Sequence, residues 1–266
     1  MSCTAPKKSG YYKTDQPIPS DSLARIKAGI RQISNDSFKA YQFYAASDFT
    51  LNYRMLYPPS TSTGRHPLVL ILHSSGTPIG TDNTSQLGVL AKLWARSSTR
   101  QQYPAYVVAP QFPARTSNYT MDSSRHVLAS LPDPRLMATL QLVDSLKDAL
   151  PIDPQKIYVV GFSMGGSSAI NSLELRPDLF AAAISISGIP SFNRMNELSQ
   201  IPIWLIHGNA DTENPFASDS LFYHELKSLK SKNLRFWEID RMEHDIYYQL
   251  YSTDLIPEWL FRFRKH

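Results

Sequence analysis

The 266-residue sequence has little of several features that mark specialised classes of protein. Its one cysteine, Cys3, excludes an intramolecular disulfide and any CxxC metal or redox site. No apolar run reaches the roughly 18 residues that a membrane-spanning helix requires. Lysine and arginine exceed the acidic residues by a formal charge of only +4 and are scattered along the chain. Nucleic acid is therefore not an expected partner.

The composition, with 42% hydrophobic and 19% charged residues, is that of a folded protein. A chain of this length suits one large α/β domain better than two small ones, so we expect a single domain at 20–266. The polar residues before it predict a flexible tail at 1–19. At the start of the domain, Ser20 and Asp21 can cap a helix at about 21–33.

Cys3 is followed by a polar stretch, an arrangement that resembles the mature start of a bacterial lipoprotein. That interpretation implies a lipid anchor at Cys3 and a place in the periplasm or cell envelope. The alternative is an incidental cysteine in a tail, with a cytoplasmic protein. A longer reading frame with an apolar segment ahead of Cys3 would distinguish the two.

From Pro67 onward, short apolar runs alternate with amphipathic segments, which predicts an α/β fold with a mostly parallel central sheet. The near-continuous hydrophobicity of these runs favours strands with helices on both faces. The expected strands are 68–72, 105–109, 157–160, 181–186, 203–206 and 234–239. Ahead of them, 39–45 and 50–57 predict an antiparallel pair at the N-terminal edge of the sheet.

Two connections bear on the ligand site that such a sheet carries at the carboxyl ends of its strands. Residues 110–132 have no clear periodicity and predict a long loop at the rim of the site. The short connection between 187 and 203 leaves no room for a large cap domain. We therefore expect an open site.

The pentapeptide Gly161-Phe162-Ser163-Met164-Gly165 lies between an apolar strand and a helix-compatible stretch. A strand that turns into a helix within one residue has no space for flanking side chains, which explains glycines two residues before and two after the serine. The serine hydroxyl is then exposed at the turn. Ser163 is accordingly the candidate nucleophile.

A serine nucleophile needs a base, usually a histidine that a carboxylate orients. Asp211 follows the strand at 203–206 and is the preferred acid, with Glu213 and Asp240 as alternatives. His244 follows the strand at 234–239 and is the preferred base. Of the other histidines, His207 is expected at a strand end in a structural role and His224 on a helix.

The order Ser163, Asp211, His244 and the surrounding motifs resemble the α/β-hydrolase superfamily, in particular its poly(3-hydroxybutyrate)-depolymerase-like, feruloyl-esterase-like and predicted-peptidase group. The resemblance runs from about Leu51 to the C-terminus. It is carried by the apolar strand into His73, Ala109-Pro110-Gln111, Ile152-Asp153-Pro154 and Arg176-Pro177-Asp178-Leu179-Phe180-Ala181-Ala182. The chain departs from the group in having Glu243, where relatives usually have glycine.

The resemblance also implies an oxyanion hole. One donor is the backbone N–H of Met164, directly after the nucleophile. Similar esterases have His-Gly after the first buried strand and a second donor one residue later, which maps to Ser75. Ser74 stands here in place of that glycine and is the alternative donor. Gln111 and Phe162 are candidates for contact with substrate.

The expected function is that of a serine carboxylic-ester hydrolase without metal or other cofactor. An open site favours short acyl esters, or acyl groups carried on a sugar or polymer. A small-peptide serine peptidase of the same fold is one alternative. A binding protein that retained the fold without turnover is another.

Overall fold

The computed structural model describes residues 9–15, 20–46, 49–76, 80 and 82–265. Cys3, and with it the predicted lipid anchor, lies outside the described residues. Within them, no helix combines the length and the apolar character that crossing a membrane requires.

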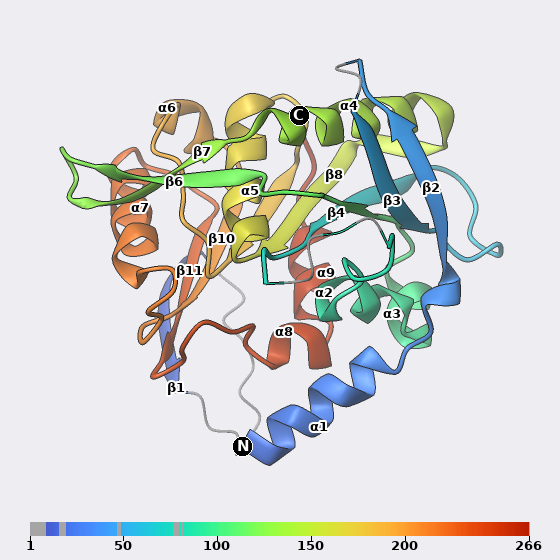
Figure 1. The fold of residues 1–266 in the computed structure, drawn as a ribbon, viewed down its shortest axis with the longest axis horizontal. Coiled ribbons are helices and arrows are strands. Elements are labelled where there is room, and N and C mark those ends of the chain that lie inside the picture. The colour runs from blue at the N-terminus through green and yellow to red at the C-terminus, as the bar shows by residue number, and fades with distance from the viewer. Residues whose placement is uncertain (1–8, 16–19, 47–48, 77–79, 81, 266) are drawn as a thin grey trace.

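The described residues form a central sheet of nine strands in the order β1-β11-β10-β9-β8-β4-β5-β3-β2 (Figure 1). The strands are β1 (Gly10–Asp15), β2 (Phe38–Tyr44), β3 (Thr50–Leu56), β4 (His66–Leu72), β5 (Tyr106–Gln111), β8 (Ile152–Phe162), β9 (Ala182–Ile186), β10 (Ile203–Gly208) and β11 (Leu234–Asp240). Among the described strands of this central sheet, only β2 with β3 and β3 with β5 pair antiparallel. The predicted mostly parallel sheet with an antiparallel edge is thus confirmed.

At the opposite edge, residues Gly10–Asp15 of the predicted flexible tail at 1–19 form a strand, because β1 pairs in parallel with β11 along its whole length. Tyr11 packs edge-on against Phe236, with ring centroids 5.3 Å apart. Lys13 forms ion pairs with Glu238 and Asp240 on the partner strand. The strand is short and half-exposed, so its sequence carries none of the hydrophobic run that identifies the buried strands.

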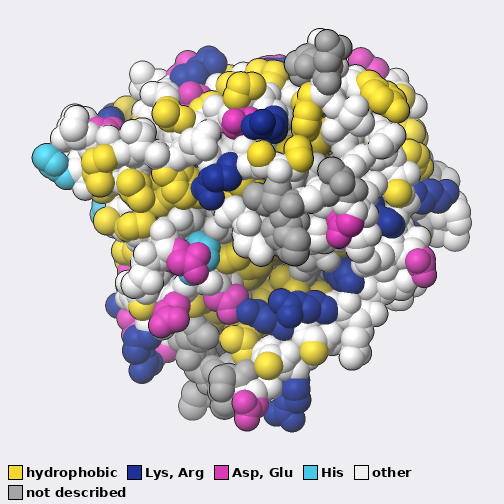
Figure 2. All heavy atoms as spheres, in the orientation of Figure 1, with side chains coloured by type: hydrophobic (Ala, Val, Ile, Leu, Met, Phe, Trp, Pro, Cys, Tyr) yellow, Lys and Arg dark blue, Asp and Glu magenta, His cyan; other side chains and the backbone are white. Residues whose placement is uncertain are grey.

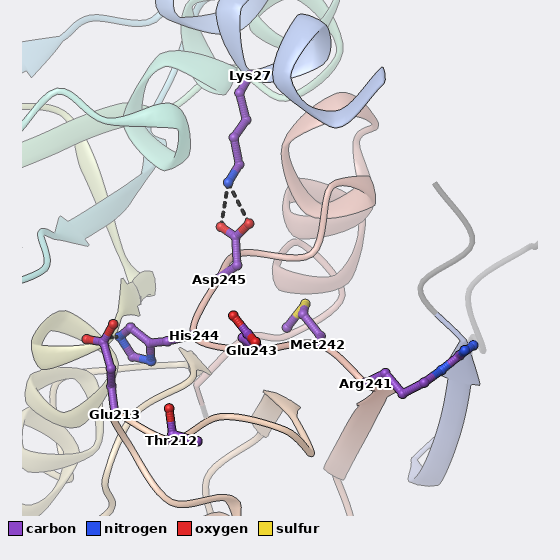
Figure 3. Close-up of a pocket in the computed structure, with 8 residues that line it drawn as sticks. All are labelled: Lys27, Thr212, Glu213, Arg241, Met242, Glu243, His244 and Asp245. Carbon is purple, nitrogen blue, oxygen red and sulfur yellow. Dashed lines mark hydrogen bonds and ion pairs between the residues drawn. The ribbon is translucent and has the colours of Figure 1, made fainter. Parts of the chain in front are cut away.

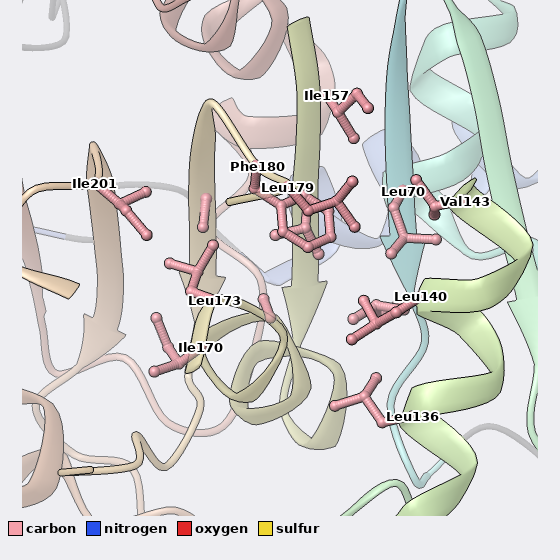
Figure 4. Packing of buried hydrophobic residues seen from close by; sticks show 14 of the residues in the cluster. Leu70, Leu136, Leu140, Val143, Ile157, Ile170, Leu173, Leu179, Phe180 and Ile201 are labelled. Atoms are coloured by element: carbon pink, nitrogen blue, oxygen red, sulfur yellow. The ribbon is translucent and has the colours of Figure 1, made fainter. Parts of the chain in front are cut away.

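The described helices are α1 (Ser20–Arg31), α2 (Val89–Lys92), α3 (Ser97–Gln102), α4 (Pro134–Ala149), α5 (Met164–Leu175), α6 (Met195–Leu198), α7 (Phe216–Ser228), α8 (Gln249–Ser252) and α9 (Leu255–Leu260), with short 3-10 helices at Asn35–Ser37 and Leu93–Ala95. They cover both faces of the sheet. Leu70 of β4 belongs to a cluster with residues of α4 and α5, and Figure 4 shows it beside Val143 and Leu140 of α4. The next residue, Ile71, belongs to a cluster with residues of α2, α8 and α9.

Residues 110–132 do not form the predicted loop, because they contain a two-stranded hairpin of β6 (Ser117–Asp122) and β7 (Val127–Pro132). The Asp122 carboxylate closes its turn by accepting hydrogen bonds from the backbone N–H groups of Ser124 and Arg125. The hairpin lies over α5 and α7 (Figure 1). Its side-chain hydrogen bonds with α5 join hydroxyl and amide groups, such as Tyr119 with Ser167 and Ser130 with Asn171, so the sequence has no hydrophobic alternation to reveal it.

Candidate active site

Ser163 is the single residue between β8 and α5, and its backbone is strained, with φ 57° and ψ −122°. The turn is tight on both sides. A Cβ atom on Gly161 would lie 2.0 Å from the carbonyl oxygen of Gly165, and one on Gly165 would lie 2.1 Å from the carbonyl oxygen of Leu72. Both contacts are with backbone, so only glycine permits this path.

The structure brings Ser163, His244 and Asp211 into one hydrogen-bonded chain. His244 Nε2 lies 2.8 Å from Ser163 Oγ, and His244 Nδ1 lies 2.7 Å from Asp211 Oδ2. Because a carboxylate can only accept, Nδ1 carries the hydrogen and Nε2 is left to accept the serine proton. Ser163 and Asp211 are buried, at 8% and 7% exposure, and the His244 side chain is 10% exposed.

Asp211 is surrounded by donors. Its Oδ1 accepts hydrogen bonds from the backbone N–H groups of Glu213 and Asn214, both at 2.9 Å. Its Oδ2 faces Nε2 of His207 at 3.2 Å as well as His244. Burial alone would raise the pKa of Asp211, but hydrogen bonds from His207, His244 and Asn214 outweigh it and hold the pKa well below its usual range. Asp211 is therefore ionised at neutral pH.

Close packing of two loops places Asp211 and His244 next to each other. Asp211 follows β10 and His244 follows β11, and these strands are neighbours in the sheet. A Cβ atom on Gly208 would lie 2.1 Å from the carbonyl oxygen of Met242, so glycine allows the loops to touch. The side chain of Asn209 then accepts a hydrogen bond from the backbone N–H of Arg241.

Neither alternative acid is the partner of His244 Nδ1, which faces Asp211. Asp240 accepts a hydrogen bond from Asn209 and pairs with Lys13 at the sheet edge. Glu213 is 74% exposed, with Oε2 3.8 Å from His244 Nε2. Figure 3 shows Glu213 beside the His244 ring and the carboxylate of Asp245 turned away towards Lys27 of α1, to which it is paired at 2.6 Å.

The loop after β4 lies beside the nucleophile turn, since Gly165 approaches the backbone of Leu72 and His73. His73 accepts a hydrogen bond at Nε2 from the backbone N–H of Phe112, so Nδ1 carries the hydrogen and donates to the carbonyl oxygen of Ser74 at 2.9 Å. Burial lowers the pKa of His73 and keeps it neutral. The ring thus fixes the peptide that joins Ser74 to Ser75.

Of the two candidates for substrate contact, Gln111 is the last residue of β5 and is buried. It is 2% exposed, and its amide is fully engaged with the backbone N–H of Asn83 and the side chains of Asp82 and Ser85. Gln111 therefore holds the loop after β4 in place. Phe162 packs against the His244 ring, with centroids 4.9 Å apart.

Two hollows adjoin these residues. A cavity of about 670 Å³ is lined by eight residues of α1 and of the loops after β10 and β11, all labelled in Figure 3. A smaller one of about 70 Å³ is mostly apolar and lies between Ser74, Phe162, Ile246 and the start of α2. Figure 2 shows acidic side chains beside a histidine near the middle of this face, with hydrophobic atoms in the adjoining hollow.

The other two histidines that the sequence singles out are both placed as expected, His207 at the end of β10 and His224 on α7. His207 is nevertheless closer to the site than sequence reasoning indicated, because its ring contacts Asp211 directly. No sequence signal links it to Asp219, its other partner, which lies on a separate helix. In the part of the chain that the structure describes, no three His, Cys, Asp or Glu side chains are grouped as metal ligands.

Comparison with known proteins relates this chain to esterases. Residues 133–252 match the phospholipase/carboxylesterase family. "Putative esterase NocK" of Nocardia uniformis subsp. tsuyamanensis is 36% identical over 87 residues, which are 32% of this chain and 25% of that protein. The poly(3-hydroxybutyrate) depolymerase of Ralstonia pickettii is 29% identical over 152 residues, covering 54% of this chain and 30% of the relative. The matches thus span less than a third of these curated relatives.

Among solved structures, a thermostable esterase superposes with a TM-score of 0.76 and 28% identity, covering 86% of this chain and 64% of the esterase. A ferulic acid esterase has a TM-score of 0.61 at 14% identity, which shows a shared fold. The chain therefore has the α/β-hydrolase fold and resembles esterases.

Proposed function

We propose that this protein is a serine carboxylic-ester hydrolase in which Ser163 is the nucleophile, His244 the general base and Asp211 the residue that orients His244. The observation that carries the proposal is the continuous chain from Ser163 Oγ through His244 to an ionised Asp211. Its distances of 2.8 and 2.7 Å suit proton transfer without rearrangement.

In the proposed reaction, His244 Nε2 takes the Ser163 hydroxyl proton while Oγ attacks the ester carbonyl carbon. The tetrahedral intermediate collapses as the protonated His244 gives that proton to the departing alcohol, which leaves an acyl group on Ser163. Water, deprotonated by His244, then attacks the acyl carbon. The bond from that carbon to Ser163 Oγ breaks as His244 returns the proton to Oγ, which releases the acid and restores the serine. Asp211 stabilises the imidazolium in both halves of the reaction.

The oxyanion of the intermediate is assigned to two backbone donors. Met164 is the first residue of α5, where N–H groups have no partner within the helix. Ser75 is favoured over Ser74 as the second donor, because the Ser74 carbonyl points to the His73 ring. In a trans peptide the next N–H points the opposite way, so the Ser75 N–H is directed away from that ring.

Under this proposal the small apolar cavity holds the acyl group and the larger polar one holds the alcohol. At about 70 Å³, the first has room for a chain of only a few carbons. The second has Lys27, Glu213 and Arg241 in its wall, which suits a hydrated alcohol such as a sugar better than a lipid.

The proposal is tested with a fluorophosphonate, which reacts with activated serines. We expect one adduct in the intact mass, on the peptide that contains Ser163, and hydrolysis of p-nitrophenyl acetate that disappears on labelling. The control is Ser163→Ala, which should not be labelled. An unlabelled parent protein, or equal labelling of the alanine variant, would overturn the proposal. Parallel assays with short peptides would detect a peptidase.

The size of the acyl cavity predicts a preference for short chains. The ratio kcat/KM for p-nitrophenyl esters should fall steeply beyond butyrate. Gly88 lines the cavity, its φ of −73° suits any residue, and a Cβ atom there would meet nothing within 4 Å. Gly88→Val should therefore lower kcat/KM for butyrate relative to acetate by about tenfold.

Gly29→Ala, on the open side of α1, is the control for this experiment and should leave the chain-length profile unchanged. If Gly88→Val keeps the parental dependence of kcat/KM on chain length, the acyl group does not occupy this cavity.

A further inference from the structure

Two buried ionisable side chains beside Asp211 take no part in the steps above. His207 lies near the end of β10 and Asp219 in the first turn of α7, and both side chains are 0% exposed. Asp219 Oδ2 lies 2.8 Å from His207 Nδ1, while His207 Nε2 lies 3.2 Å from Asp211 Oδ2. The imidazole therefore bridges the two carboxylates.

The partners of His207 determine where its hydrogens are. Nε2 faces the carbonyl oxygen of Asn214 at 2.9 Å in addition to the Asp211 carboxylate, and both groups can only accept. Nε2 must therefore carry a hydrogen, which it shares between the Asn214 carbonyl oxygen and Asp211 Oδ2. On the other side, Nδ1 and Asp219 share a proton.

The pKa shifts of His207 and Asp219 support the same placement of hydrogens. Burial alone would lower the pKa of His207, but hydrogen bonds to Asp211 and Asp219 raise it to about 9. Burial also raises the pKa of Asp219, and its Oδ1 has no hydrogen-bond partner among the described residues. A buried ion pair with an unsatisfied oxygen contributes little to folding stability. The effect of the His207–Asp219 pair on Asp211 explains the presence of this pair better than a contribution to stability does.

We propose that His207 is a positioning residue for Asp211 and that Asp219 holds the His207 ring in its donating orientation. The inference rests on the proposed catalytic role of Asp211. The backbone donors hold only Oδ1 of that carboxylate. The oxygen that faces His244 is Oδ2, and besides His244 itself its side-chain donor is His207. His207 thus fixes the atom on which the orientation of His244 depends.

The test is a double variant, His207→Leu with Asp219→Leu, which removes the donor without leaving an unpaired buried charge. We expect kcat for p-nitrophenyl acetate to fall by about 10- to 100-fold with little change in KM. The acid limb of the kcat–pH profile should move to higher pH, because the negative charge on Oδ2 is then compensated by His244 alone. His207→Gln with Asp219→Asn retains a neutral N–H donor and should recover most of the lost kcat.

Phe222→Leu, a core substitution in α7 at a ring that packs against Phe192, is the control for lost stability. It should lower Tm and leave kcat and the acid limb as in the parent. If the leucine pair does not fold, the isosteric Asp219→Asn takes its place, and its acid limb should also move to higher pH because His207 loses its charge.

The inference and the proposed function fail in different ways. Absence of fluorophosphonate labelling at Ser163 in the parent would overturn the function. A parent that is labelled, together with a folded leucine-pair or Asp219→Asn variant whose acid limb does not move, would overturn the role of His207. An equal shift of the acid limb in Phe222→Leu would do the same.

Discussion

Replacement of Asp211 by asparagine should lower kcat by about 10⁴-fold while KM and the fold are largely preserved. Asp211 accepts hydrogen bonds on both oxygens, from two backbone N–H groups at Oδ1 and from His207 and His244 at Oδ2. The NH₂ group of an asparagine must face either the backbone N–H groups or the two histidines. In both cases one hydrogen-bond donor faces other donors, and a hydrogen bond is lost. If the NH₂ group faces His244, the imidazole is driven into the tautomer with hydrogen on Nε2, which cannot accept the proton of Ser163.

Steady-state hydrolysis of p-nitrophenyl acetate by Asp211→Asn measures this effect. The matched control is Asp240→Asn, at the end of the neighbouring strand, whose carboxylate contacts Asn209 and Lys13. It should retain most of the parental kcat. Comparable losses in the two variants would mean that Asp211 has no special relation to His244.

Replacement of Gly208 by alanine should have the second large effect, on both activity and stability. The new Cβ atom would lie 2.1 Å from the carbonyl oxygen of Met242 and 2.9 Å from that of Glu243. Backbone atoms cannot rotate away as a side chain can, so the loop that carries His244 must move. We expect kcat/KM to fall by about 10²-fold and the free energy of unfolding by about 1–3 kcal/mol.

Urea unfolding and ester hydrolysis of Gly208→Ala would be measured together. Gly29→Ala is the comparison, because a Cβ atom there meets nothing within 4 Å and alanine favours the helix. Parental stability and activity in Gly208→Ala would show that the two loops are not in the tight contact described.

Much of the fold follows from local sequence. The buried strands are recognisable in the sequence as continuous apolar runs, such as Leu68 to Leu72 in β4. A strand that is covered on both faces must be hydrophobic along its whole length. The edge strand β1 and the hairpin of β6 and β7 have no such requirement. The side chains of β1 are partly exposed, and those of the hairpin make hydroxyl contacts with α5. The sequences of these strands therefore resemble loops.

The sequence by itself determined the order of the buried strands. It also determined the candidates Ser163, Asp211 and His244, because strand ends of a parallel sheet collect such residues at one edge. Only the tertiary structure decided which groups touch. It turned Gln111 inward to hold a loop. It also placed His207 between Asp211 and Asp219, although Asp219 lies 12 residues after His207 in the chain. Such contacts join residues from separate elements, and no local pattern encodes the direction in which a side chain points after the elements pack.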